Sequence, residues 1–234
     1  QLEAIVDGLS CRVITYSETQ DADYTAKNIT FDKLGNASFD LVKYGELLGR
    51  IQMSVVGMHN VSNALSTIAA ADIMGIPLES IRDGILSFTG TDRRFQLKGT
   101  RNGVTIIDDY AHHPTEIRAS LTSARNYPHR DIWCIFQPHT YTRTKAFFHE
   151  FAEALTLADH VILTDIYAAR ETDTLGMTSE ALAEDVKRLG TDAYYLSSFE
   201  AIENFVLEKC IRGDMLITMG AGDVVNIGES LLSQ

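Results

Sequence analysis

Residues 131–165, DIWCIFQPHTYTRTKAFFHEFAEALTLADHVILTD, hold two short apolar runs on either side of a segment with helical spacing. The runs predict strands at 131–137 and 160–165, and the segment between them predicts a helix at 143–157. Both runs are apolar almost throughout, which is typical of strands that helices cover on two faces. The stretch therefore predicts a βαβ unit of a parallel sheet.

The same alternation continues on both sides of this unit. A hairpin is predicted from residue 95 to residue 110, with its turn at 101–103. Further helices are predicted at 114–126, 178–189, 198–209 and 223–232, and further strands at 193–196 and 214–219. This order predicts an α/β fold with a mostly parallel, doubly wound sheet and helices on both faces.

Residues 1–56 have a different pattern. Four short runs rich in β-branched and aromatic residues, CRVITYS, AKNITFD, ASFDLVKYG and RIQMSVV, predict strands, and Gly35-Asn36 predicts a hairpin turn. Helical spacing then predicts helices at 60–74 and 78–87. This part of the chain is therefore expected to be β-rich and to end in two helices.

The stretch FTGTDRRF at 88–95 is a polar connector between these two patterns. We expect a boundary near Asp92, which gives two domains, 1–92 and 93–234. A length of 234 residues fits one or two domains and suffices for a hydrophobic core.

The chain is acidic, with 20 Lys and Arg against 32 Asp and Glu and a formal net charge of −12. This balance argues against a nucleic-acid partner and against an anionic membrane surface. No apolar run approaches the roughly 18 residues of a membrane span, so we expect no membrane insertion.

The three cysteines, Cys11, Cys134 and Cys210, are far apart and have no CxxC spacing. They argue against a disulfide framework and a structural zinc site, and they favour a cytoplasmic location. The first residue is Gln1, within sequence that already has the pattern of a folded domain. We therefore expect a fragment of a longer protein.

Polar clusters follow four predicted strands, at residues 108–114, 137–143, 165–171 and 220–223. In doubly wound sheets, ligands bind outside the carboxyl ends of the strands. These clusters are therefore the candidate site.

Each cluster also has a structural interpretation. Asp109 could satisfy backbone donors in its loop, and His113 could cap the helix that Pro114 begins. His139 and Arg143 at a helix start favour an anion such as a phosphate or carboxylate, although Arg143 could also be unpaired in a surface loop. The GAGD sequence at 220–223 could approach a ligand or form a tight turn.

Two classes of function other than nucleotide-driven chemistry remain open at this point. The carboxylates and imidazoles of Asp108, Asp109, His112, His113 and His139 suit a metal-dependent phosphoesterase. A non-catalytic regulatory module is the other alternative, since a fold does not determine a function.

Two signals lie near the predicted boundary. Asn60 and Asn63 share one helix face and could read the edge of a base, although Asn60 could instead be an N-cap. Arg94 could reach a phosphate or form an interdomain ion pair. The chain contains neither GxxxxGK[ST] nor GxGxxG, so it lacks a recognisable phosphate-binding loop.

Six motifs in this order resemble the Mur ligases: HNVSNAL, RRFQ, DDYAHHPTEI, FQPHTYTRT, DIYAARE and GAGD. The resemblance covers most of the chain. The combination of DDYAHHPTE and PHTYTRT is most similar to the member that adds L-alanine to UDP-N-acetylmuramate in peptidoglycan synthesis. A ligase that recycles murein peptides is the related alternative, for which DDFAHHPT without the second motif is expected.

The resemblance implies an ATP-dependent acid–amino-acid ligase that works through an acyl phosphate, with ATP and Mg²⁺ as cofactors. Residues 1–92 would be the end of a central ATPase domain, and 93–234 would be a C-terminal Rossmann-like domain. The UDP-substrate domain, the P-loop and the metal ligands would lie in missing N-terminal domains. We therefore expect no metal ligands in this chain and no activity of the fragment alone.

The resemblance also implies roles for individual residues. Asn60 and Asn63 would contact adenine, Arg94 would contact the ribose and phosphates, and Asp109 would bind the ribose.

In the same resemblance, Tyr110, His112 and His113 would face the acyl phosphate and the incoming amine. His139 and Arg143 would hold the carboxylate of alanine or of the muramyl substrate, with Arg143 also counted among the catalytic residues.

Overall fold

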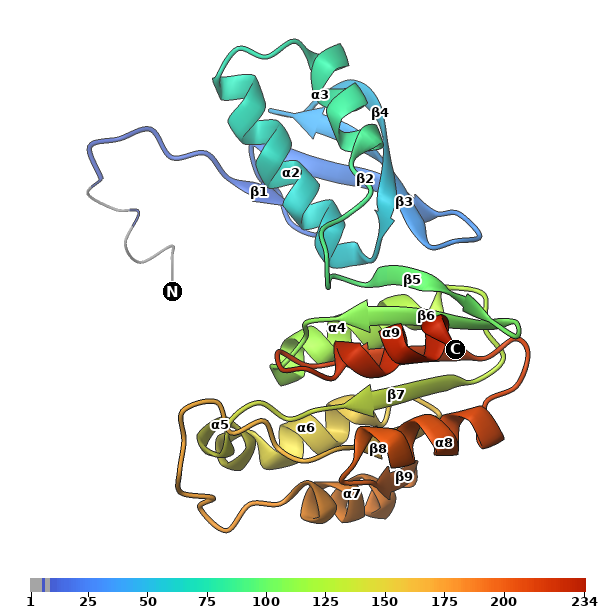
Figure 1. The fold of residues 1–234 in the computed structure, drawn as a ribbon. Helices are drawn as coiled ribbons and strands as arrows, with labels where there is room; N and C mark the ends of the chain where they lie inside the picture. The colour runs from blue at the N-terminus through green and yellow to red at the C-terminus, as the bar shows by residue number, and fades with distance from the viewer. Residues whose placement is uncertain (1–5, 7–8) are drawn as a thin grey trace. The chain divides into compact units, whose positions relative to one another are not determined.

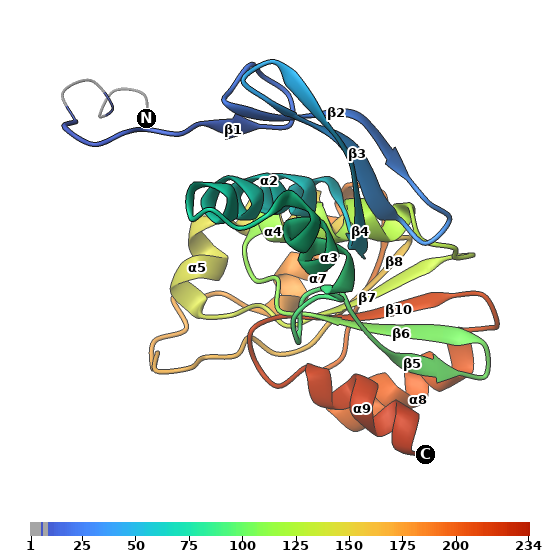
Figure 2. The same cartoon turned by 90° about the horizontal axis from the view of Figure 1, so that it is seen from above.

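A computed structural model describes residue 6 and residues 9–234 (Figures 1 and 2). The chain separates into two compact units, of which the first ends at Thr89 and the second comprises Gly90–Gln234. The position expected for the boundary, Asp92, lies just inside the second unit, where its carboxylate accepts a hydrogen bond from Gln96 Nε2 at 2.8 Å.

The first unit contains a four-stranded sheet in the order β1-β2-β3-β4. Strand β1 is parallel to β2, and the other pairs are antiparallel. The elements are β1 (Tyr16–Ser17), β2 (Tyr24–Phe31), β3 (Asn36–Lys43), β4 (Glu46–Val56), α2 (Met58–Ile73) and α3 (Leu78–Ser87). Helix α2 packs on β1, β2 and β3, and α3 packs on β4.

The run CRVITYS forms far less strand than expected, because only Tyr16–Ser17 are strand residues. The backbone N–H of Thr15 donates to the Asp23 carboxylate at 2.8 Å, and the N–H of Asp23 donates to Thr15 Oγ1 at 3.0 Å. Side-chain contacts of this kind replace ladder hydrogen bonds.

The second unit contains a six-stranded sheet in the order β5-β6-β10-β7-β8-β9. Its strands are β5 (Gln96–Arg101), β6 (Val104–Asp109), β7 (Ile132–Phe136), β8 (His160–Leu163), β9 (Asp192–Tyr195) and β10 (Met215–Met219). Strand β5 pairs with β6 in the antiparallel sense, and all other pairs are parallel. The predicted α/β fold with a mostly parallel sheet is confirmed.

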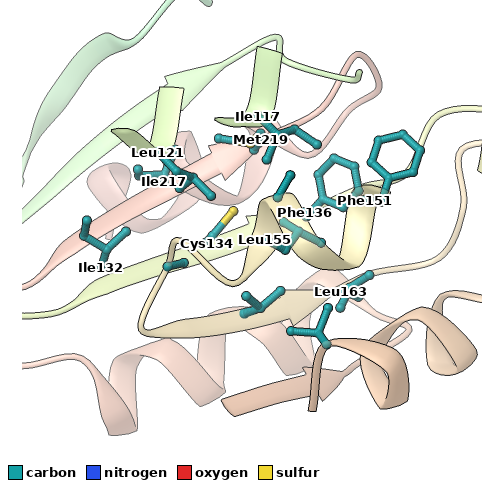
Figure 3. Close-up of a cluster of buried hydrophobic side chains, with 14 of the residues drawn as sticks. Ile117, Leu121, Ile132, Cys134, Phe136, Phe151, Leu155, Leu163, Ile217 and Met219 are labelled. Atoms are coloured by element: carbon teal, nitrogen blue, oxygen red, sulfur yellow. The ribbon is translucent and has the colours of Figure 1, made fainter. Parts of the chain in front are cut away.

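Helices cover both faces of this sheet (Figure 2). The helices are α4 (Pro114–Arg125), α5 (Tyr141–Ala146), α6 (Phe148–Leu155), α7 (Ser179–Arg188), α8 (Phe199–Lys209) and α9 (Val225–Ser233). Ile107 and Ile217 belong to the core on the α4, α6 and α7 side, whereas their neighbours Ile106 and Leu216 belong to the core on the α8 and α9 side. Figure 3 shows Ile217 in the first of these cores, together with Phe136 and Phe151. Consecutive strand residues point to opposite faces, so apolar runs fill both cores.

The helix predicted at 143–157 is divided into α5 and α6 at Phe147, which has φ −121° and ψ 29°. At this break, the Phe147 ring lies edge-on against His113, with 4.7 Å between ring centroids, and against Phe151 at 6.4 Å. Apolar spacing continues through the break, so the sequence pattern could not locate it.

No helix within residue 6 and residues 9–234 combines the length and apolar character needed to cross a bilayer.

Truncating Phe151 to alanine tests the core between α6 and the sheet. Phe151 is fully buried and lies 5.6 Å from Phe136 between ring centroids. Phe151→Ala should lower the free energy of unfolding of the second unit by about 3–5 kcal/mol because it leaves a cavity. Urea unfolding followed by the fluorescence of Trp133, the single tryptophan, reports on this unit.

The matched control is Leu189→Ala, since Leu189 is 52% exposed. This variant should change the free energy of unfolding by less than about 0.5 kcal/mol. Equal unfolding midpoints for the two variants would contradict the assigned core.

Candidate functional site

The candidate site lies at the carboxyl ends of β6, β10 and β7, which are neighbours in the sheet. The chain passes from β6 to β7 and returns to place β10 between them, so this edge is a topological switch point. The loop after β8 joins the same edge through a parallel bridge between His139 and Tyr167. The four polar clusters therefore leave one edge of one sheet.

An ion pair joins two of these clusters to the connector that precedes β5. Arg93 Nε donates to Asp108 Oδ2 at 3.0 Å, and Arg93 Nη2 donates to the Gly220 carbonyl at 2.8 Å. The other oxygen of the fully buried Asp108 accepts from Thr218 Oγ1 at 2.7 Å. Arg93 and Asp108 thus hold the strand ends together.

Asp109 is almost completely buried, and its carboxylate is hydrogen-bonded to backbone N–H groups and to a serine of the same unit. Its carboxylate accepts from the N–H of Phe95 at 3.0 Å, the N–H of Ala111 at 2.8 Å and Ser120 Oγ at 2.6 Å. Burial raises the pKa of Asp109, and these hydrogen bonds oppose the rise. Asp109 therefore does satisfy backbone donors, as its structural interpretation predicts. Its contact with a ribose stays a prediction.

Aromatic rings from three loops form a continuous row. Tyr110 and His112 have ring centroids 5.4 Å apart, His112 and His139 are 5.9 Å apart, and His139 stacks on Tyr167 at 5.6 Å. The Arg93 guanidinium lies 4.8 Å from the centroid of the Tyr110 ring. The predicted site residues Tyr110, His112 and His139 are thus brought together.

The two adjacent histidines have different roles. His113 is the N-cap of α4, and its Nδ1 accepts from the N–H of Thr115 at 3.3 Å, so the capping interpretation is confirmed. His112 is instead part of the row of rings. Its ring Nδ1 lies 2.9 Å from the Tyr110 carbonyl, and its backbone N–H donates to Glu116 Oε2 at 3.0 Å.

Arg143 lies in α5 with Nη1 3.4 Å from His139 Nδ1. Helix α5 is capped by Thr140, whose Oγ1 accepts from the N–H of Arg143 at 3.4 Å. Among the described residues, no carboxylate forms an ion pair with Arg143. Burial chiefly, then the charges of Arg143 and His112, lower the pKa of His139, while Glu171 opposes them.

A half-buried guanidinium beside a neutral imidazole can bind an anion. A carboxylate or phosphate there would accept charge-assisted hydrogen bonds from Arg143.

The GAGD loop packs tightly on Gln137, a residue whose role the sequence analysis missed. A Cβ on Gly220, which has φ 147°, would lie 2.7 Å from the Gln137 carbonyl oxygen. Gln137 Nε2 donates to Asp223 at 2.8 Å, and its Oε1 accepts from the N–H of Val224 at 3.3 Å. Gly220 is required because its backbone approaches Gln137 too closely for a side chain. This contact within the fold favours the interpretation of GAGD as a tight turn.

The ligand set proposed for a metal-dependent phosphoesterase does not form. Asp108 is occupied by Arg93 and Thr218, and Asp109 is occupied by backbone N–H groups and a serine. Within the described part of the chain, no three His, Cys, Asp or Glu side chains gather as a group that could hold a metal ion.

In the first unit, Asn60 is not an N-cap, because α2 begins at Met58 with Gly57 as its N-cap. Asn60 Nδ2 instead donates to the Val56 carbonyl at 2.8 Å, and Asn63 Nδ2 donates to Asn60 Oδ1 at 3.0 Å. Asn60 thereby orients the side chain of Asn63, which is an exposed residue.

In the second unit, Arg94 is exposed and has no ion pair with a described acidic residue, in contrast to Arg93. The two adjacent arginines therefore differ. Arg93 belongs to the scaffold, whereas Arg94 is exposed and its charge is among the influences that oppose the raised pKa of Asp109.

Two family models match the chain. The model described as Mur ligase middle domain matches residues 1–71, and the model described as Mur ligase, glutamate ligase domain matches residues 93–222.

Curated relatives are similar over almost the whole chain. It is 51% identical to the UDP-N-acetylmuramate–L-alanine ligase of Lachnoclostridium phytofermentans, over 99% of this chain and 52% of that protein. It is 53% identical to the ligase of the same name from Agathobacter rectalis, over 99% of this chain and 50% of that protein. The chain spans about half the length of the curated relatives it matches.

Solved structures are similar as well. The UDP-N-acetylmuramate-alanine ligase of Thermotoga maritima has a TM-score of 0.80 and 27% identity, covering 94% of this chain and 47% of that one. A murein peptide ligase from Psychrobacter arcticus has a TM-score of 0.65 and 25% identity, covering 93% of this chain and 45% of that one.

Replacing Arg143 tests the electrostatic link to His139. The positive charge of Arg143 lowers the pKa of His139, so Arg143→Gln should raise that pKa toward its ordinary value. A pH series of carbon–proton NMR spectra of the His139 ring measures the shift.

Lys145→Gln removes the same charge from the exposed surface of α5 and is the matched control. It should leave the pKa of His139 unchanged. If both variants change the pKa of His139, or if neither does, the assigned contact between Arg143 and His139 is wrong.

Proposed function

The chain belongs to the Mur ligase family, and on that premise we propose that it is part of an ATP-dependent ligase that joins L-alanine to UDP-N-acetylmuramate. Residues 1–92 would be the end of the central ATP-binding domain, and residues 93–234 the C-terminal Rossmann-like ligase domain. The matched family models and the relatives with 43–53% identity support this assignment. In this proposal, the N-terminal domains of a longer protein would be the required partners, which fits the coverage of only about half of each relative.

The observation that carries the proposal is the contact of Arg143 with His139, a member of the row of aromatic rings at the carboxyl edge of the sheet. Both substrates of such a ligase carry a carboxylate. Arg143 would bind one of these carboxylates through its guanidinium, and the lowered pKa of His139 keeps that imidazole neutral, so His139 adds hydrogen bonding without a second full charge.

His112 is proposed as the group that accepts the proton which the amino group of L-alanine must lose before it attacks. Its ring lies between those of Tyr110 and His139, and its Nδ1 lies 3.5 Å from Glu116 Oε2. A histidine at such a position can act as a general base near neutral pH. Tyr110 would line the same reaction site, and His113 would position this loop through its cap of α4.

The nucleotide contacts are proposed for each unit separately. In the first unit, Asn63, oriented by Asn60, would contact the adenine edge. In the second unit, the exposed Arg94 would contact the ribose and phosphates, and Asp109 would reach the ribose only by giving up part of its present contacts. Bound ATP would supply the phosphoryl group that activates the substrate carboxylate.

Mg²⁺ has no candidate ligand group among the described residues, so no role in metal binding is assigned to this chain.

The function is tested with the full-length enzyme. ADP release should require both UDP-N-acetylmuramate and L-alanine, and replacement of L-alanine by a murein peptide should abolish it. Preference for the peptide would instead identify the recycling ligase.

In the full-length enzyme, Arg143→Ala should lower kcat/KM by roughly 10- to 100-fold, since a hydrogen bond to a charged group contributes about 1.5–3 kcal/mol. Steady-state ADP release measures this loss. The control Arg118→Ala removes an arginine that pairs with Glu153 on the surface, 3.1 Å away, and should leave the rate unchanged. Equal rates for the two variants would contradict the role of Arg143.

The 234-residue polypeptide alone should release no ADP in response to L-alanine, because its sequence has no GxxxxGK[ST] loop. A coupled assay for ADP measures this directly, with the full-length enzyme as the positive control. Turnover by the polypeptide would show that the nucleotide site is complete without further domains.

A further inference from the structure

We propose that Glu171 is a positioning residue that fixes the first turn of α5 and, through that turn, the place of Arg143 beside His139. Glu171 lies in the loop after β8, whereas α5 follows β7. The proposal deepens the function proposed above, on which only its kinetic test depends.

The two loops are joined by backbone contacts. The N–H of Thr140 donates to the Tyr167 carbonyl at 2.9 Å, and the N–H of Tyr167 donates to the Pro138 carbonyl at 2.9 Å. These bonds flank the bridge between His139 and Tyr167. The start of α5 is therefore anchored on the segment that leads to Glu171.

The start of α5 is strained. Thr140 has φ 67°, which is an outlier for a β-branched residue. Such a conformation persists only where surrounding contacts hold it in place. The buried Thr144 is one of those contacts, since its Oγ1 donates to the Thr140 carbonyl at 2.7 Å.

Glu171 supplies the contact from the opposite loop. Its Oε2 accepts from the N–H of Thr142 at 3.0 Å, and its Oε1 accepts from Thr142 Oγ1. The hydrogen bond from the Thr142 side chain is the main cause that lowers the pKa of Glu171. The charged carboxylate thus holds the residue immediately before Arg143.

Glu171 acts on Arg143 without neutralising it. The carboxylate forms its hydrogen bonds with Thr142 and has no ion pair with Arg143 among the described residues. The guanidinium therefore keeps its charge for a ligand while its backbone is held in place.

The same geometry makes His139 a reporter. The charged or titratable groups that act on its ring are Arg143 from α5, His112 from the loop after β6 and Glu171 from the loop after β8, and Tyr167 stacks on it. Arg143 and His112 lower the pKa of His139, and Glu171 raises it. Loss of the Glu171 charge alone would lower that pKa, whereas displacement of Arg143 would remove a larger effect of the opposite sign and raise it.

The test uses Glu171→Gln in the isotopically labelled 234-residue chain. The Thr142 amide should exchange with solvent roughly three- to fivefold faster, the size expected for an exposed charged contact. The pKa of His139 should rise, because Arg143, whose effect on it exceeds that of Glu171, is displaced. A fall would show that Arg143 stays in place and would overturn the proposal. Unchanged exchange and an unchanged titration would overturn the proposal, and neither readout depends on the proposed function.

Glu180→Gln is the matched control. It removes the same charge from the first turn of α7, where Thr178 already caps the helix. It should alter neither the Thr142 amide nor His139. Equal effects of the two variants would overturn the proposal by showing a general charge effect.

Thr142→Val removes the hydroxyl partner and leaves the charge at Glu171. In a Thr142→Val background, Glu171→Gln should have a smaller effect on exchange of the residue 142 amide than in the wild type, because the two side chains share one interaction. Fully additive effects would contradict the proposed contact.

In the full-length enzyme, Glu171→Gln should raise KM for a carboxylate substrate about three- to fivefold with less change in kcat, because binding by Arg143 is weakened. A loss confined to kcat would contradict positioning of Arg143. If the NMR results hold while the enzyme does not use L-alanine, the positioning role stands and the proposed function fails.

Discussion

The buried carboxylate of Asp108 constrains the whole carboxyl edge of the second unit's sheet. A charge without solvent exposure is stable inside a protein only when strong partners surround it. Arg93 and Thr218 are those partners, and Arg93 also bonds the Gly220 carbonyl. The segment before β5, the end of β6 and the loop after β10 are therefore fixed together. The site loops leave the sheet at this rigid point, so their side chains start from defined positions.

Burial and charge together set the protonation state of the side chains in the site. His139 is kept neutral mainly because its ring is partly buried, and the positive charge of Arg143 adds to that effect. Arg143 remains charged without an acidic partner among the described residues. A neutral donor or acceptor beside a full positive charge favours one bound carboxylate over two, which would suit the carboxylate contact proposed for Arg143.

The sequence predicted the sheet, its helices on both faces and the clustering of polar loops, because apolar runs of strand length and their flanking residues are local signals. It failed where tertiary contacts decide. Phe147 breaks a helix whose apolar spacing is uninterrupted, and Gly57 replaces Asn60 as the cap of α2. The hydrogen bond between Glu171 and Thr142 joins residues 29 positions apart, so no local pattern could reveal it.

The alternation of side chains along β6 explains why adjacent carboxylates do not act as a pair. Ile106 faces the core under α9 and Ile107 the core under α4. Continued by one residue each, this alternation sends Asp108 toward Thr218 and Asp109 toward Ser120 of α4. Two neighbouring acids at the end of a doubly covered strand therefore point into opposite layers. A shared metal would need them on one side, whereas a scaffold that locks both layers at a site's edge needs them apart.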